Sequence, residues 1–94
     1  MKKIPLRPET EKMARWLALA GDPTRLRIFY LLFAEKEACV SQIAESLGMT
    51  IANISHHLQL LKDNGLCTME RKGNTICYQL IQNDFTQKLK SIIG

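Results

Sequence analysis

Two adjacent histidines, His56 and His57, stand in the helix-like stretch TIANISHHLQLLKDNG. An imidazole can bind a metal, move a proton or form hydrogen bonds with a partner. Two metal ligands on one helix face usually stand four residues apart, yet neither histidine has a His, Cys or carboxylate three or four positions away. No nucleophile motif accompanies them either. We therefore predict neither a metal site nor a catalytic site at this pair.

The two histidines point in different directions if this stretch is a helix with about 100° between successive residues. Ile51, Ile54, Leu58 and Leu61 then mark its buried side, with His57 at the edge of that side and His56 on the opposite face. We predict that His56 reads base edges of DNA, with a plain surface role as the alternative. We predict that His57 is a half-buried, hydrogen-bonded residue. The rest of the outward face is small and polar, and it comprises Ala52, Asn53, Ser55 and Gln59.

The charge of the chain favours an anionic partner. Its 94 residues carry a formal net charge of +4, and no acidic residue stands between Glu45 and Asp63, which suits a surface that approaches phosphates. Hydrophobic residues make up 46% and charged residues 23%, which excludes a disordered chain and indicates one small domain over residues 1–94. No apolar run is long enough to cross a bilayer, and no signal peptide follows the N-terminal lysines, so we expect a cytoplasmic protein.

Three cysteines, Cys39, Cys67 and Cys77, form no CxxC or CxC pair. An odd number in a compartment expected to be reducing argues against a structural disulfide framework. Cys67 and Cys77 belong to a predicted hairpin whose register sends their side chains to opposite faces, which disfavours a disulfide between them. We therefore expect no structural disulfide, and we predict that Cys67 is a small core residue.

Apolar residues at helical spacing, together with capping residues and glycines, predict five helices and one hairpin. Ser41 is expected to cap the third helix, and Ala44 and Gly48 have the spacing of the close contact and sharp turn in a helix–turn–helix. The order of these elements along the chain predicts a winged helix-turn-helix, mainly α with a small β-hairpin wing. The expected helices cover about residues 8–20, 23–34, 41–47 and 50–64, with a short extended piece at 38–40 and a last helix from Asn83 or Asp84.

The stretch LCTMERKGNTICYQL predicts a β-hairpin with a two-residue turn at Lys72 and Gly73. This register pairs Met69 with Ile76 and places the apolar residues of both strands on one face. Arg71 and Lys72 at the tip are predicted to contact the minor groove or the adjacent DNA backbone, with a solvated charged turn as the alternative.

Three segments, LALAGDPTRLRIFYLL, SQIAESLGMTIANISHHLQLLKDNGL and ERKGNTICYQL, together resemble the ArsR/SmtB family of metal-responsive bacterial repressors. The resemblance covers nearly the whole chain from Ala14 to Leu80. It implies a homodimer that binds double-stranded DNA at an imperfect palindromic operator of its own operon. It also implies a dimer interface between the first and last helices, in agreement with two apolar stripes that include Met13, Trp16, Leu17, Phe85, Leu89 and Ile92.

The predicted DNA-contacting set combines the family's recognition-helix contacts with residues at the helix ends and at the wing tip. The recognition contacts carry over onto Ala52, Asn53, Ser55 and His56. The whole set is Ser41, Thr50, Ala52, Asn53, Ser55, His56, Gln59, Arg71 and Lys72.

The effector sites of this family are incomplete here. The Cys-x-Cys site keeps Cys39 but has Ser41 at its second position, and the site of His and acidic residues on the last helix keeps only Asp84. The persulfide-sensing subgroup has cysteines in the second and last helices, and this chain has none there. We therefore predict no cofactor. Three alternatives stay open: an unfamiliar inducer or none, an atypical thiophilic metal site that uses Cys39, and thiol oxidation of Cys39 or Cys77.

Two other classes of function compete with a repressor. Winged helices also serve as protein–protein interaction modules without nucleic acid, and salt-dependent retention on DNA discriminates between the two. A small enzyme or metal-binding protein needs a catalytic constellation or a ligand cluster, and the sequence shows neither. We therefore expect no enzymatic activity.

Overall fold

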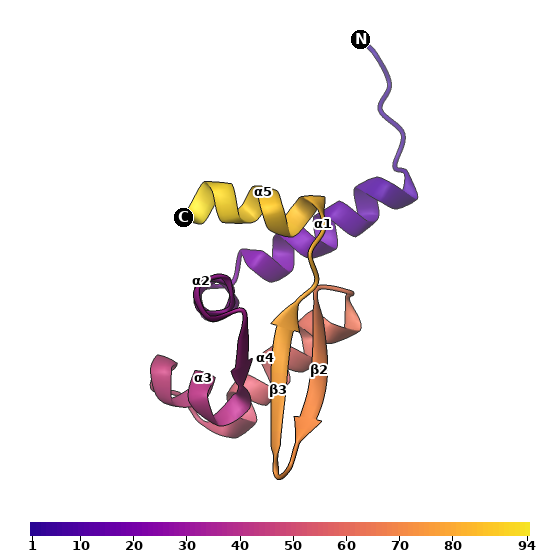
Figure 1. Cartoon of the computed structure of the whole chain (residues 1–94). Helices are drawn as coiled ribbons and strands as arrows, with labels where there is room; N and C mark the ends of the chain where they lie inside the picture. Colours follow the sequence, from indigo (N-terminus) through magenta and orange to yellow (C-terminus); the bar gives the residue numbers. More distant parts are fainter.

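A computed structural model describes all residues from 1 to 94 and confirms the winged helix-turn-helix (Figure 1). Helices α3 and α4 form the helix–turn–helix, and strands β2 and β3 form the wing. None of the helices has the length and apolar character to cross a membrane. The elements are α1 (Pro8–Ala20), α2 (Pro23–Glu35), β1 (Glu37–Cys39), α3 (Val40–Leu47), α4 (Ile51–Asp63), β2 (Cys67–Lys72), β3 (Thr75–Leu80) and α5 (Asp84–Ile93).

Side-chain caps define where three of the helices begin. The Asp22 carboxylate accepts the backbone N–H of Arg25 at the start of α2, and Thr50 accepts the N–H of Asn53 at the start of α4. Asn83 caps α5 in the same way. The cap at Asn83 agrees with the predicted start of the last helix, and each of the three caps satisfies a backbone donor that the first turn of a helix leaves free.

The predicted cap of α3 was wrong. Cys39, not Ser41, is the residue that precedes this helix, and the Gln42 side chain accepts the backbone N–H of Cys39 at 2.8 Å. The reason is that β1 runs directly into α3 without an intervening turn, so the last residue of the strand is also the N-cap. Ser41 therefore lies inside the first turn of α3, with its side chain exposed.

The small sheet has three strands in the order β1-β3-β2, all antiparallel. Strand β1 pairs with β3 through three residue pairs, of which Cys39 and Cys77 are the last. The sequence predicted the hairpin and a short strand at 38–40 but not their pairing, because a strand of three residues has too few positions to show an alternating pattern. Strand β1 therefore attaches the wing to the beginning of α3.

The register of the hairpin also differs from the prediction. Met69 lies opposite Tyr78 rather than Ile76, and the turn is formed by Gly73 and Asn74 rather than by Lys72 and Gly73. Gly73 has a φ of +63°, and the favoured two-residue hairpin turns need a positive φ at their first central position. Glycine adopts this conformation without steric cost, so it occupies that position. The shift by two residues leaves every side chain on its predicted face.

The hydrophobic core lies between α2, α4 and the sheet, whereas α1 and α5 form a layer at the opposite end from the wing (Figure 1). Ile28, Phe29 and Leu32 of α2 are buried at its centre. Helix α1 has a single buried residue, Ala20. Its Trp16 indole N–H donates to the carbonyl of Asn64 at 2.7 Å, and its ring packs on Phe85 of α5 with 5.3 Å between ring centroids.

Candidate nucleic-acid interface

Helix α4 has the two faces that its periodicity predicted, except at its first residue. Ile51 was predicted for the buried side but is 56% exposed and lies outside the hydrophobic core, because the core does not reach the first turn of the helix on that side. Ile54, Leu58 and Leu61 are completely buried against the rest of the domain. The opposite side of the helix is open to solvent near its N-terminus. Its side chains are Ala52, Asn53 and His56, which are exposed, and Ser55, which is half-buried. The direction of His56 is therefore confirmed, while its contact with DNA stays a prediction.

Two members of the predicted set already have partners within α4. The Thr50 hydroxyl caps the helix by accepting the Asn53 N–H at 3.1 Å. At the other end of the predicted surface, the Gln59 side-chain amide donates to the Asp63 carboxylate at 2.8 Å. The first half of the helix, from Thr50 to His56, is therefore the part whose polar groups are free of acidic neighbours. Its free N–H groups also give this end a partial positive charge that favours phosphates.

His57 is half-buried and hydrogen-bonded, as predicted. Its Nδ1 lies 3.1 Å from a guanidinium nitrogen of Arg25, whose Nε also donates to the carbonyl of Leu19 at 2.8 Å. A guanidinium can only donate, so Nδ1 accepts and His57 is neutral with its proton on Nε2. Burial, and then the charge of Arg25, lower the pKa of His57, against a smaller opposing effect of Asp22. His57 therefore ties α4 to the beginning of α2.

We expect the domain to lose stability as the pH falls below about 6.5, the ordinary pKa of histidine. Because folding lowers the pKa of His57, the unfolded chain binds this proton more readily than the folded chain. The stabilisation from neutral His57 is complete above the unfolded pKa and is lost as the pH falls through the folded pKa. Urea unfolding between about pH 7.5 and about pH 5 measures this loss. His57→Gln, which keeps an acceptor for Arg25, should make the decrease shallower, and an unchanged decrease would contradict the assignment.

The tip of the wing carries Arg71 and Lys72, both exposed as predicted. The sequence did not reveal that Lys72 has a partner on another strand. Its Nζ lies 2.5 Å from one carboxylate oxygen of Glu37 in β1, and the Gln79 amide donates to the other oxygen at 2.9 Å. These hydrogen bonds lower the pKa of Glu37, and the same contact raises the pKa of Lys72. Only the pairing of β1 with β3 brings these groups together.

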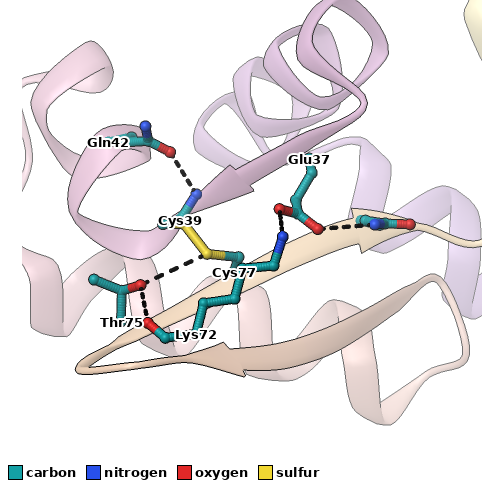
Figure 2. The surroundings of a disulfide bond; sticks show 7 residues. Glu37, Cys39, Gln42, Lys72, Thr75 and Cys77 are labelled. Carbon is teal, nitrogen blue, oxygen red and sulfur yellow. Dashed lines mark hydrogen bonds and ion pairs between the residues drawn. A yellow bond between two sulfur atoms is a disulfide. The ribbon is translucent and has the colours of Figure 1, made fainter.

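The cysteines contradict the prediction of a chain without disulfides and confirm that Cys67 is a core residue. Cys39 of β1 and Cys77 of β3 form a disulfide, so the expectation of a chain without disulfides was wrong (Figure 2). The two residues stand directly opposite each other in a strand pair that the sequence did not reveal. Cys67 is a free, buried thiol in the core, as predicted, and burial raises its pKa to about 12. In this state Cys39 offers no thiolate to a metal, and no three His, Cys, Asp or Glu side chains of the structure could together hold one.

The predicted dimer face is an apolar groove between α1 and α5, with a volume of about 200 Å³. Phe85 and Leu89 form its floor and are already buried within the domain. Its rim consists of exposed side chains, with Leu17 56% and Ile92 80% accessible to solvent, together with Met13. Trp16, also predicted for this face, is half-buried against Phe85.

A helix–turn–helix with a polar outward face, followed by a wing with a basic tip, defines the winged helix-turn-helix class of transcription regulators. The comparisons with known proteins identify the family within this class. The family model described as bacterial regulatory protein, arsR family, matches residues 22–68. The chain belongs to the ArsR family.

Two curated relatives and one solved structure show how far the similarity extends. The chain is 35% identical over 68 residues to a cadmium resistance transcriptional regulatory protein CadC homolog of Staphylococcus aureus, covering 72% of this chain and 56% of that protein. It is 33% identical to an uncharacterized HTH-type transcriptional regulator of Methanocaldococcus jannaschii, covering 87% and 92%. A homodimeric winged helix-turn-helix DNA-binding domain from Mycobacterium bovis superimposes with a TM-score of 0.78 at 29% identity, covering 98% and 86%.

Proposed function

We propose that this chain is a homodimeric transcriptional repressor that binds a palindromic operator. The observation that carries the proposal is the outward face of α4, where small and polar side chains stand at the helix N-terminus without an acidic neighbour. Membership of the ArsR family supports it, and so does the homodimeric state of the structural relative from Mycobacterium bovis. In each subunit α4 would enter one major groove, with the two grooves about one helical turn apart.

The predicted contacts fall into two groups by the chemistry of their side chains. Asn53, Ser55 and His56 can form hydrogen bonds with base edges, and Ala52 leaves room for a close approach. Ser41, Thr50, Arg71 and Lys72 lie at a helix start or at the wing tip, where contacts go to phosphates. Gln59 stands further along α4 and must leave Asp63 to take part.

We expect His56→Ala to reduce the preference for operator over unrelated DNA by about tenfold, because a base contact contributes mainly to discrimination. The operator is first selected from fragments of the source genome by the reduced protein. Binding of this fragment and of an unrelated fragment is then titrated for both proteins. Gln87→Ala, an exposed polar residue on α5, is the matched control and should change neither affinity. Unchanged affinity of His56→Ala for both fragments would contradict the assignment of α4.

Lys72→Ala is expected to weaken binding to all DNA sequences by a similar factor. It should also reduce the slope of log affinity against log salt concentration by about one, the contribution of one phosphate contact. Lys90→Ala, on α5 far from the wing, removes the same charge and should leave the salt dependence unchanged (Figure 1). If no genomic fragment were retained at any salt concentration, the repressor proposal would fail and a protein–protein interaction module would take its place.

A further inference from the structure

The Cys39–Cys77 disulfide joins the beginning of the helix–turn–helix to the wing (Figure 2). We propose that this pair is a reversible thiol–disulfide site, oxidised by low-molecular-weight disulfides, and that its oxidation weakens DNA binding. The proposal names the regulation of the repressor proposed above and rests on that function.

The backbone keeps the two cysteines together in either redox state. They are direct partners in the antiparallel pairing of β1 with β3, so their side chains leave the sheet on the same face. Opening the disulfide does not remove this strand pairing. The two thiols of the reduced protein therefore remain neighbours, and the bond can form again without a rearrangement of the fold.

The two sulfur atoms differ in their access to solvent. Cys39 is half-buried, whereas Cys77 is only 1% exposed. Cys39 also stands at the N-cap of α3, where free backbone N–H groups stabilise a thiolate, the form that attacks a disulfide. Cys39 is therefore the residue that a small reagent reaches first, and Cys77 is the residue that closes the bond. Cys67 is enclosed in the core and takes no part.

The exchange proceeds in two balanced steps. The Cys39 thiolate attacks one sulfur of a small disulfide RSSR, which forms a mixed disulfide and releases RS⁻. The Cys77 thiolate then attacks the Cys39 sulfur of the mixed disulfide and releases a second RS⁻. The protons of the two protein thiols pass to these leaving groups, so two cysteines are oxidised while one RSSR is reduced to two RSH. An excess of RSH reverses both steps.

Oxidation would act on the wing through the contacts around the disulfide. Every residue of the predicted DNA-contacting set lies in the sequence between Cys39 and Cys77. In the disulfide-closed structure, Lys72 at the wing tip is bound to Glu37, which is two residues from Cys39 on the same strand (Figure 2). Reduction leaves the three residue pairs between β1 and β3 in place but removes the covalent link beside Glu37, so the Lys72 side chain is less constrained and can exchange Glu37 for a phosphate.

The test uses oxidised glutathione on the reduced chain of 94 residues. Peptide mapping should find Cys39 linked to Cys77 within one chain, and excess reduced glutathione should reverse the link. We expect the oxidised protein to bind the selected operator about tenfold more weakly, since it loses the phosphate contact of one wing lysine in each subunit. Wild-type protein is compared with itself in two redox states, so the comparison does not depend on the folding of a variant.

Three variants separate the causes of this effect. Cys67→Ala removes the third thiol and should respond as the wild type does. Cys39→Ser should bind DNA with the same affinity before and after treatment. Glu37→Gln should still form the disulfide but should lose most of the difference in affinity, because its amide holds the Lys72 ammonium weakly.

Two results would overturn the proposal. One is the absence of an intrachain disulfide after treatment, and the other is an equal affinity of both redox states for the operator. A failure of the proposed function itself looks different, since the disulfide would then form and reverse while neither state binds any genomic fragment.

Discussion

Leu17→Glu should convert the protein to monomers and lower its affinity for the operator by about a hundredfold or more, which corresponds to about 3 kcal/mol. Leu17 lies on the rim of the groove between α1 and α5, with 56% of its surface exposed in the single chain. In the proposed dimer it would pack against the same face of a second chain. A carboxylate there would be desolvated in an apolar interface without a partner of opposite charge.

Dimerisation and DNA binding are measured separately for this variant. Sedimentation equilibrium gives the mass of the species in solution, and titration of the selected operator gives the affinity. Met69→Glu is the matched control, because Met69 is an exposed apolar residue of the wing, 43% accessible and on a different element from the groove. It should remain dimeric. A dimeric Leu17→Glu, or a monomer with undiminished operator affinity, would contradict the proposed assembly.

Ile54→Ala is expected to destabilise the domain by about 3 kcal/mol, a large part of the stability of a small domain. Ile54 is completely buried on the inner side of α4, so its truncation leaves a cavity directly behind the outward face. Since α4 is held to the core by Ile54, Leu58 and Leu61, operator binding should decrease as well, although Ile54 itself faces away from DNA.

Ile51→Ala is the control for this substitution. Ile51 begins the same helix but is 56% exposed, and its truncation should change the free energy of unfolding by less than about 1 kcal/mol. Urea unfolding followed by circular dichroism measures both variants. If Ile54→Ala and Ile51→Ala lowered the free energy of unfolding equally, the burial of Ile54 against the core would be contradicted.

From Ile54 onward the sequence was sufficient for the faces of α4, because Ile54, Leu58 and Leu61 recur at helical spacing and are all buried. Ile51 has the same spacing but is exposed at the first position of the helix. The same periodicity separated His56 from His57. The caps of α2 and α4 were also predictable, because Asp22 and Thr50 are residue types whose side chains accept hydrogen bonds from the first turn. These features depend on neighbours in the sequence.

The features that were missed depend on contacts between distant segments. Glu37 meets Lys72, and Cys39 meets Cys77, only because β1 pairs with β3 across more than thirty residues. Three residues of β1 show no pattern that would reveal this pairing. The hairpin turn was misplaced for a different reason, since either Lys72-Gly73 or Gly73-Asn74 preserves the alternation of faces. Only the pairing of the strands, which places Lys72 opposite Thr75, distinguishes them.

The disulfide also determines what a cut in the backbone would release. Residues 39–77 form a closed covalent ring that contains α3, α4, β2 and the first half of β3, whereas α1 and α2 precede the ring and α5 follows it. A protease that cleaves between Gly73 and Asn74, at the exposed turn of the wing, would therefore release no fragment from the oxidised protein. The two pieces of the nicked chain would stay covalently joined until a reductant opens the disulfide, so a cleaved wing would remain attached to the domain for as long as the two cysteines are oxidised.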